Sequence, residues 1–493
     1  MEELDKRLPV IVGVGQYKQQ LDDVTSALEQ YRLMEEAVRL AADDAGCSSL
    51  LNSIDQMLVI GGMWRYPDPG RLILESIGSP EARTFLTAMG GNMPQTCVSE
   101  VCELITANQI DVAVITGGEA VYSKNKLKKL GLELPRDGSE KELDPATPYG
   151  ENIPMSSEHE RANGFYMPTQ IYALFESAIR FSLGETHQEH RDRIAALWEG
   201  FNKVAVSNPF AWVRSSMTAE EIKTPSPSNR MVGYPYTKSM NANSFVDYGG
   251  AIIVCSVEKA QLLGISRDRW VFPHVATDGN ASYLFSQRES FHESPAMRIA
   301  GERCFELAGL SVDDVGHMDL YSCFPSCVQL IMAELGISSD RVVTTTGGLP
   351  FFGGPMNSYV IHAIASTVDA IRETGEMGYV HANGGYATKQ ACGIYGSSPP
   401  SKPFRRVNVQ SEIDKNPLRE VDETPRGLAT IEAYTVMHNR EGPETALISS
   451  LMIDGRRALT TTDDQSLMSE MMKEEYIGRS VDIDTDGSIG LVA

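Results

Sequence analysis

The chain has 493 residues, of which 42% are hydrophobic, and its formal net charge is −23 at pH 7. The length allows about two to four domains with a large buried core. The negative charge argues against broad binding to nucleic acids or anionic membranes, because both need a positive surface field. No apolar run reaches the roughly 18 residues of a membrane span, so we expect a cytoplasmic protein without one.

Cysteine and histidine positions give no indication of a metal site. The eight cysteines are scattered and include no Cys-x-x-Cys pair, which favours reduced thiols. His187 and His190 are three residues apart, but charged neighbours such as Glu185 and Asp192 are typical of a solvated helix face. We therefore expect no metal cofactor.

The first part of the chain alternates short apolar strands with amphipathic helices. Strands are predicted over 10–16, 54–62 and 111–119, and helices over 33–46 and 94–108. This alternation is typical of a parallel sheet with crossover helices. Residues 1–120 are therefore predicted to form one α/β unit.

Residues 121–235 lose this alternation and are predicted to be an excursion laid over the sheet domain. From 236 to 400 it returns, with a strand and helix over 249–264, helices over 294–310, 325–336 and 353–375, and strands over 314–324 and 379–387. Doubled glycines bound a helix and strand in both parts, at 90–91 and 117–118 and again at 353–354 and 384–385. The pattern indicates a duplicated α/β fold with its sites where the two halves meet.

The end of the chain has a different character. Residues 396–406, "GSSPPSKPFRR", are predicted to be a stiff polar linker. Alternating segments over 429–439, 444–462 and 479–492 follow, separated by turn signals. Residues 401–493 are therefore predicted to form an antiparallel β-barrel domain of the OB type.

Several segments in order resemble the thiolase superfamily: "NANSFVDYGGAIIVCSVEKAQLLG" (241–264), "FELAGLSVDDVGHMDLYSCF" (305–324), "GGLPFFGGP" (347–355) and "NGGYATK" (383–389). They are most similar to its sterol-carrier-type branch and to the group called thiolase-like protein type 1, which has an additional C-terminal domain. The resemblance covers about residues 8–400. It implies a thiolase fold of two layered αβαβα halves, an acyl-CoA or coenzyme A ligand, and a homodimer built on the first half.

The resemblance also shows which thiolase side chains are missing. The position of the nucleophilic cysteine falls on Gly91, that of the histidine in the Gly-His-Pro loop on Gly354, and that of the second cysteine on Ala382. Cys97 lies six residues beyond Gly91, within the predicted helix, so we expect a core residue rather than a nucleophile. Conventional thiolysis would lack its nucleophile and its acid/base.

A tyrosine occupies a fourth thiolase element, at Tyr321 in "YSCF". A tyrosine there resembles the thiolase-fold retro-aldolases, which work with an OB-fold partner and cleave 3-hydroxyacyl-CoA without a cysteine. Tyr321 is then a candidate base, provided that its surroundings lower its pKa, and Asn383 a candidate donor to the thioester oxygen. Tyr386 is a candidate second phenol, and Cys323 a replacement nucleophile for acyl transfer. Each of these residues also fits a purely structural role.

The expected binding groups are main-chain donors and lysines. Doubled glycines at three loops suggest close backbone approach, either to a ligand or to the other half. Lys126 and Lys128 lie in a lysine-rich stretch that suits nucleotide phosphates or a plain exposed helix face. A CoA-thioester-binding pseudoenzyme remains the alternative to a lyase. The expected CoA-binding residues are Gly91, Asn92, Gly353, Gly354, Gly384, Gly385, Lys126 and Lys128.

Overall fold

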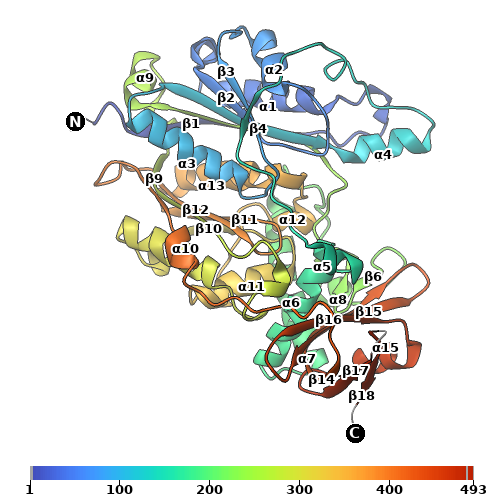
Figure 1. Ribbon diagram of the computed structural model, residues 1–493. Helices are drawn as coiled ribbons and strands as arrows, with labels where there is room; N and C mark the ends of the chain where they lie inside the picture. The colour runs from blue at the N-terminus through green and yellow to red at the C-terminus, as the bar shows by residue number, and fades with distance from the viewer. Residues whose placement is uncertain (1–3, 485–486, 492–493) are drawn as a thin grey trace.

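The structure is a computed structural model that describes residues 4–484 and 487–491 (Figure 1). The first of its sheets belongs to the N-terminal half of the molecule. Its six strands are β1 (Pro9–Lys18), β2 (Gln56–Val59), β3 (Arg83–Thr87), β4 (Val112–Ala120), β5 (Thr147–Tyr149) and β8 (Asp247–Ser256). Their spatial order is β1-β8-β4-β2-β3-β5. The short strand β5, from the excursion, pairs with β3 and so covers one edge of the sheet.

The second sheet belongs to the other half and runs in the order β10-β11-β12-β9-β13. These strands are β9 (Phe272–Asn280), β10 (His317–Leu320), β11 (Gly378–Gly384), β12 (Lys389–Gly396) and β13 (Arg405–Asn408). The prediction that 396–406 is a linker is wrong at both ends, because Gly396 ends β12 and Arg405 and Arg406 pair with β9. The residues between these two strands, 397–404, lead from the end of β12 to the edge of the sheet beside β9, where β13 adds.

Helices form the layers around and between these sheets. They are α1 (Gln30–Asp44), α2 (Pro69–Ile77), α3 (Met93–Thr106), α4 (Val121–Lys129), α5 (Glu158–Ala162), α6 (Pro168–Ser182), α7 (His187–Ser207), α8 (Ala219–Lys223), α9 (Val257–Leu262), α10 (Pro295–Ala308), α11 (Pro325–Glu334), α12 (Gly348–Phe351), α13 (Tyr359–Thr374), α14 (Gln410–Ile413) and α15 (Gln465–Met471). Helices α3 and α13 contact each other and both sheets, so they form the central layer. Helix α1 covers the outer face of the first sheet, and α10 that of the second.

Glycines allow α1 to lie directly on the first sheet. A Cβ on Gly13 or Gly15 of β1 would lie 2.0 Å from a carbonyl oxygen of α1, and one on Gly249 of β8 would lie 1.9 Å from Leu33 O. No larger residue fits such close contact between a helix and a sheet. The glycine-rich strands thus fix the outer layer of the first half.

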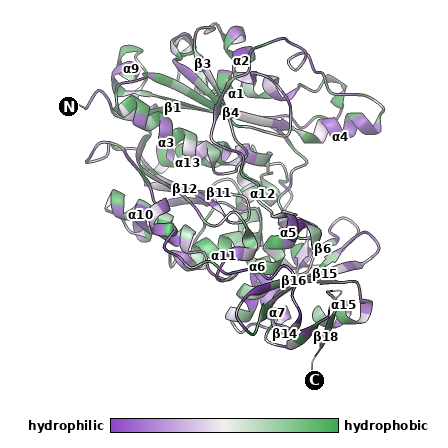
Figure 2. Ribbon diagram, viewed as in Figure 1, coloured by the Kyte–Doolittle hydropathy of each residue, from purple (hydrophilic) through white to green (hydrophobic). Residues whose placement is uncertain are grey.

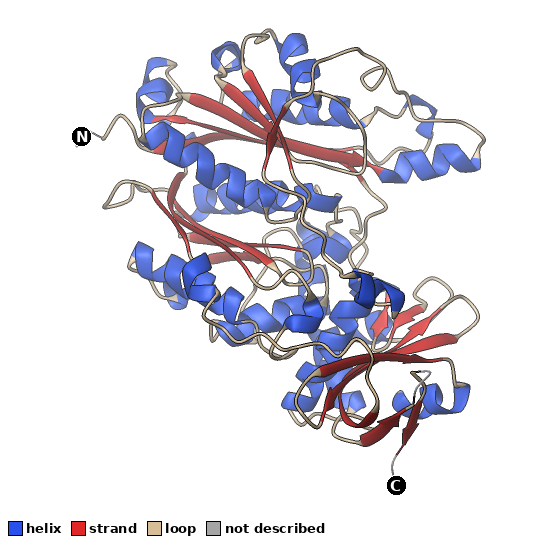
Figure 3. Ribbon diagram, viewed as in Figure 1, coloured by secondary structure: helices blue, strands red, loops and turns tan. Residues whose placement is uncertain are grey.

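The C-terminal segment forms a separate antiparallel sheet beside the excursion helices (Figure 3). Its strands are β14 (Gly427–His438), β15 (Pro443–Met452), β16 (Arg457–Thr462), β17 (Ser480–Ile483) and β18 (Ile489–Leu491). The excursion contributes β6 (Met231–Gly233), which pairs with β14 and with β7 (Tyr236–Thr237). Closure into an OB-type barrel stays a prediction, and part of the strand predicted over 479–492 lies outside the described residues.

Candidate active site

Two loops of the second half leave the sheet at the same edge. Strands β10 and β11 pair in parallel, with Leu320 opposite His381. Tyr321 follows β10 directly, and Asn383 and Gly384 end β11. Carboxyl ends of parallel strands are where α/β folds place their ligand sites.

The loop before α3, in the first half, faces this edge. A Cβ on Gly91 would lie 2.4 Å from the Tyr321 hydroxyl oxygen and 2.5 Å from the Asn383 carbonyl oxygen. A Cβ on Gly384 would lie 2.8 Å from Asn92 Oδ1. Only glycine permits these approaches. The structure therefore brings five of the predicted residues into one cluster, here called the glycine cradle: Gly91, Asn92, Tyr321, Asn383 and Gly384.

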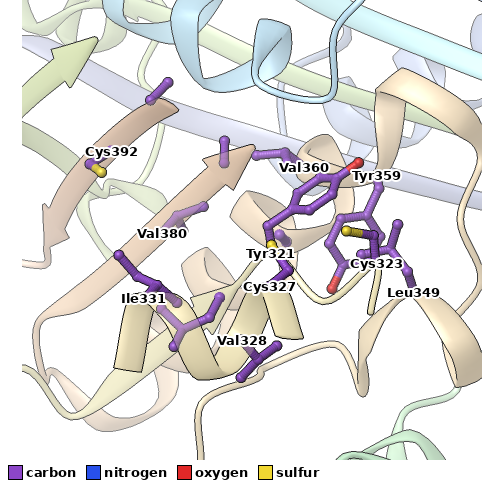
Figure 4. Packing of buried hydrophobic residues seen from close by; sticks show 14 of the residues in the cluster. Tyr321, Cys323, Cys327, Val328, Ile331, Leu349, Tyr359, Val360, Val380 and Cys392 are labelled. Carbon is purple, nitrogen blue, oxygen red and sulfur yellow. The ribbon is translucent and has the colours of Figure 1, made fainter. Parts of the chain in front are cut away.

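Tyr321 presents an unengaged hydroxyl in this cradle. In Figure 4 its hydroxyl points away from Cys327 and Val328, while its ring meets that of Tyr359 edge-on at 5.7 Å. Among the described residues, no hydrogen bond engages this hydroxyl. Burial raises the pKa of Tyr321 well above its ordinary value, so the condition for a phenolate base, a lowered pKa, is not met. Tyr321 is a neutral phenol that can donate a hydrogen bond.

The first-half side of the cradle has unused hydrogen-bonding capacity. Asn92 Oδ1 is buried without a partner, although Asn92 Nδ2 donates to Thr96 Oγ1 at 3.3 Å. The main-chain N–H of Gly91 also has no partner among the described residues. Buried polar atoms are normally paired, so unpaired ones that share one site are candidates for ligand contacts.

The Asn383 side chain, by contrast, is fully engaged. Its Nδ2 donates to the hydroxyl of Tyr172 at 2.9 Å, and its Oδ1 accepts from Gln390 Nε2 at 3.3 Å. The Tyr172 hydroxyl also accepts from the Ala387 N–H at 2.8 Å and donates to the Gly385 carbonyl at 3.0 Å. One phenol from α6 thus holds the whole loop between β11 and β12.

Comparison with known proteins identifies this architecture. A crystal structure of a monomeric SCP2-thiolase-like protein type 1 from Mycobacterium smegmatis is 30% identical, with a TM-score of 0.84, and the alignment covers 99% of this chain and 100% of that one. The model of the thiolase-like protein type 1 additional C-terminal domain matches residues 408–488. The chain belongs to the SCP2-thiolase-like protein type 1 family.

More distant relatives agree on the fold. The Ltp2-ChsH2(DUF35) aldolase structure is 18% identical with a TM-score of 0.60, over 79% of this chain and 98% of that one. The acetyl-CoA acetyltransferase of Methanocaldococcus jannaschii is 24% identical over 45% of this chain, and the match spans only 56% of that protein. The predicted thiolase fold with an additional C-terminal antiparallel domain is therefore confirmed.

Within this family fold, the remaining predicted glycines face protein rather than the cradle. Gly353 lies against Val246 and Tyr248, and the Gly354 N–H donates to the Asn243 carbonyl at 2.8 Å. Gly385 has a φ of +70° and faces Met155. Positive φ and close neighbours explain the glycines at 353 and 385 without invoking a ligand, whereas a Cβ at Gly354 would come no closer than 3.2 Å to Leu349 Cδ2.

Tyr386 and the cysteines have structural partners. The Tyr386 hydroxyl donates to the Tyr166 carbonyl at 2.6 Å, and burial raises its pKa. Cys323 is only 8% exposed, and its carbonyl accepts from the Ala242 N–H. Cys97 is fully buried inside α3, and burial raises the pKa of its thiol, which confirms the prediction of a core residue. A nucleophilic role for Cys323 stays a prediction.

Lys126 and Lys128 lie on α4, which is largely hydrophilic in Figure 2. Lys126 Nζ lies over the ring of Tyr122 on the same helix, and Lys128 is exposed. The buried face of α4 packs through Leu127 on a small cluster that includes Val24 and Leu33. The structure thus does not bring these lysines into the glycine cradle.

Sequence reasoning missed a different lysine. Lys389, the first residue of β12, is 8% exposed, and its Nζ donates to the Met89 carbonyl at 2.7 Å. A Cβ on Gly90 would lie 3.5 Å from this Nζ, so the ammonium group borders the cradle. Burial lowers its pKa. The signal available in the sequence was its place directly after "GGYAT", at the start of a strand.

The region of His187 and His190 is not a solvated helix face. His190 is fully buried, with Nε2 2.5 Å from Glu176 Oε1 and Nδ1 2.7 Å from Glu185 Oε2. Across residues 4–484 and 487–491, no group of three or more His, Cys, Asp or Glu side chains has the arrangement of a metal site. No helix within those ranges is long and apolar enough to cross a membrane.

Proposed function

We propose that the protein binds an acyl-CoA thioester at the glycine cradle and cleaves the C2–C3 bond of a 3-hydroxyacyl-CoA by retro-aldol chemistry. The observation that carries this proposal is the place of the Tyr321 hydroxyl. It lies 2.4 Å from the point where a side chain at Gly91 would begin, which is the nucleophile position that the family resemblance assigns. In this proposal the phenol of Tyr321 takes over the place that the resemblance assigns to the thiolase thiol.

Retro-aldol cleavage moves one proton from the 3-hydroxyl group to C2. The 3-hydroxyl proton leaves, the C2–C3 electron pair passes into the thioester as an enolate, and C2 then takes up a proton. In a concerted relay, the phenol oxygen takes the 3-hydroxyl proton while the phenol's own proton passes to C2, so the tyrosine is neutral before and after the step and no covalent intermediate forms. Such a relay uses the neutral phenol, which is the form that the raised pKa of Tyr321 favours.

Donors near the cradle suit the developing enolate oxygen. The unpartnered Gly91 N–H is a main-chain donor, and Lys389 adds a positive charge beside Gly90. Fixed donors in a water-excluded site stabilise such an oxyanion strongly. In this proposal Asn383 positions its loop rather than contacting the thioester, because both ends of its amide are already bonded.

A second candidate is a non-catalytic CoA-thioester-binding protein. It is favoured by the glycines at positions 91 and 354 and by alanine at 382, which remove every side chain of conventional thiolysis. The cradle would then present its open donors to a thioester without turning it over. Dimerisation through the first half stays a prediction, while β5 already covers the β3 edge of that half.

Incubation with 3-hydroxyacyl-CoA and 3-ketoacyl-CoA panels separates the two candidates. We expect aldehyde or ketone release from the 3-hydroxyacyl-CoA, and a loss of at least about 100-fold in kcat for Tyr321→Phe. Tyr386→Phe is the matched control, since its hydroxyl bonds only to protein, and it should keep most of the activity. CoA-thioester binding without product from any panel member would favour the second candidate.

A further inference from the structure

The segment 285–291 of the second half contacts both the loop between β11 and β12 and the C-terminal domain. On the first side, the Arg288 side chain is buried, and its Nη1 donates to the Ala387 carbonyl at 3.2 Å. Its Nη2 donates to the Glu293 carbonyl at 3.0 Å, which holds the guanidinium in place. Arg288 is thus one support of the loop that continues from Gly384 of the glycine cradle.

Ala387 depends on such support because its backbone conformation is unfavourable for a residue with a Cβ. Its φ is +55°, in the left-handed region. A non-glycine residue keeps this conformation only where the surrounding structure holds it. The Ala387 N–H donates to the Tyr172 hydroxyl at 2.8 Å, and its carbonyl accepts from Gln390 Nε2 at 2.9 Å as well as from Arg288. The shape of this loop is therefore imposed by its neighbours.

The C-terminal domain in turn holds the backbone at Arg288. Arg457, at the start of β16, is fully buried, and its Nη1 donates to the Ser286 and Arg288 carbonyls. The Arg419 N–H donates to the carbonyl between them, that of Gln287, at 2.9 Å. Both of these donors lie within the matched C-terminal domain. Three successive carbonyls of the second half are thus bonded to that domain.

Glu432 orients the Arg457 side chain toward this backbone. Its Oε2 accepts from Arg457 Nη2 at 2.9 Å, and its Oε1 accepts from Arg457 Nε and, at 2.8 Å, from Ser449 Oγ. The Arg457 guanidinium also lies over the Phe291 ring, 4.1 Å from its centre. A two-point contact with a carboxylate fixes the plane of a guanidinium. The remaining Nη1 is therefore aimed at segment 285–291 in one direction.

We propose that Arg457 is a positioning residue of the glycine cradle, through which the additional C-terminal domain sets the shape of the loop after β11. The contacts run from Glu432 through Arg457 to the backbone of Arg288, and from the Arg288 side chain to Ala387. This role rests on acyl-CoA binding at the cradle and is the same for both candidate functions.

Hydrogen–deuterium exchange of the full-length protein, with and without Arg457→Lys, tests this link. Lysine keeps the positive charge beside Glu432, but its compact ammonium group lacks the planar fork that holds a carboxylate and two carbonyls together. We expect the amides of 384–389 to exchange at least about fivefold faster in this variant, because a less firmly held segment opens more often.

Arg456→Lys is the matched control at the neighbouring position. The Arg456 side chain is partly exposed and pairs with Asp454 and Asp422, so this variant should leave exchange over 384–389 unchanged. A purely structural role of Arg457 would speed exchange in β15 and β16 alone. Unchanged exchange over 384–389 in Arg457→Lys would therefore overturn the proposal.

Acyl-CoA affinity, measured by calorimetry, is a second readout. We expect binding to Arg457→Lys to be at least about threefold weaker, because a less ordered loop costs more to fix on binding. Faster loop exchange in this variant, with no acyl-CoA binding by the unaltered protein, would support the link and contradict the proposed function. Equal affinity of the two proteins would contradict a role of Arg457 in positioning the cradle.

The unaltered protein decides the question if Arg457→Lys does not fold. Exchange is then followed at increasing urea concentrations below the unfolding midpoint. We expect the amides of 384–389 to lose protection no later than those of β16, because the loop depends on the C-terminal domain. A loop that stays protected after β16 has exchanged would overturn the proposal.

Discussion

Two loops face each other across the glycine cradle and differ in how they are held. The loop from Asn383 to Ala387 is tied by Tyr172, Gln390 and Arg288, so nearly every polar atom in it has a partner. The loop from Met89 to Asn92 keeps an unpaired N–H and an unpaired amide oxygen. The difference indicates that the loop after β11 forms a fixed wall of the cradle, whereas the loop before α3 keeps polar groups that a ligand can engage.

Among the changes that test this difference between the two loops, removing the Tyr172 hydroxyl should lower the free energy of unfolding most. Tyr172→Phe leaves two donors and one carbonyl without their partner, and each buried unpaired group costs about 1–3 kcal/mol. We expect a loss of about 2–4 kcal/mol in the free energy of unfolding, measured by urea denaturation. Tyr166→Phe is the control, because Tyr166 is 51% exposed and should change stability by less than about 0.5 kcal/mol. Equal effects of the two variants would contradict a fixed wall held by Tyr172.

A side chain added between the two loops should lower the free energy of unfolding by an intermediate amount. Gly91→Ala places a Cβ 2.5 Å from the Asn383 carbonyl, which is backbone and cannot rotate away. Overpacking of this kind costs about 1–3 kcal/mol, and we expect acyl-CoA binding to be lost as well. Gly200→Ala in α7 meets nothing within 4 Å and should instead stabilise by about 0.5–1 kcal/mol. Retained acyl-CoA affinity in Gly91→Ala, measured by calorimetry, would show that the ligand binds elsewhere.

The smallest effect on stability is expected at Asn92. Asn92→Ala removes two long contacts of Nδ2, to Thr96 Oγ1 and Met93 Sδ, and an oxygen that has no partner, so the free energy of unfolding should fall by less than about 0.5 kcal/mol. Acyl-CoA affinity should nevertheless drop several-fold if the amide oxygen contacts the ligand. A large stability loss with unchanged affinity would mean that Asn92 supports the helix start and not a ligand.

The sequence and its family resemblance named all five residues that the structure brings together in the glycine cradle. Doubled glycines mark close approaches, and the family pattern placed the lost nucleophile at Gly91, where the structure finds the Tyr321 hydroxyl. The alternation of strands and helices likewise predicted the layers of both halves. Short elements without such a pattern, including α2, β3 and β5, were not predicted.

Long-range contacts explain what the sequence could not provide. Tyr172 and Asn383 are 211 residues apart, and no sequence pattern near either residue predicts their hydrogen bond. The pKa of Tyr321 depends on burial by residues from several elements, so the sequence left open whether its surroundings lower or raise it. Strand β13 was not predicted because the residues before it are rich in proline. It is a strand only because it pairs with β9 at the edge of the second sheet.

The strand β6 has a consequence for how this protein can be divided. Residues 231–233 belong to the excursion by position in the chain but pair with β14 of the additional C-terminal domain. A fragment beginning near residue 408 would lack that neighbour, and a truncated core would expose Tyr234, whose N–H donates to Val436 O. Gene fragments cut at the apparent domain border should therefore yield two insoluble products, whereas co-expression of both should restore a folded pair.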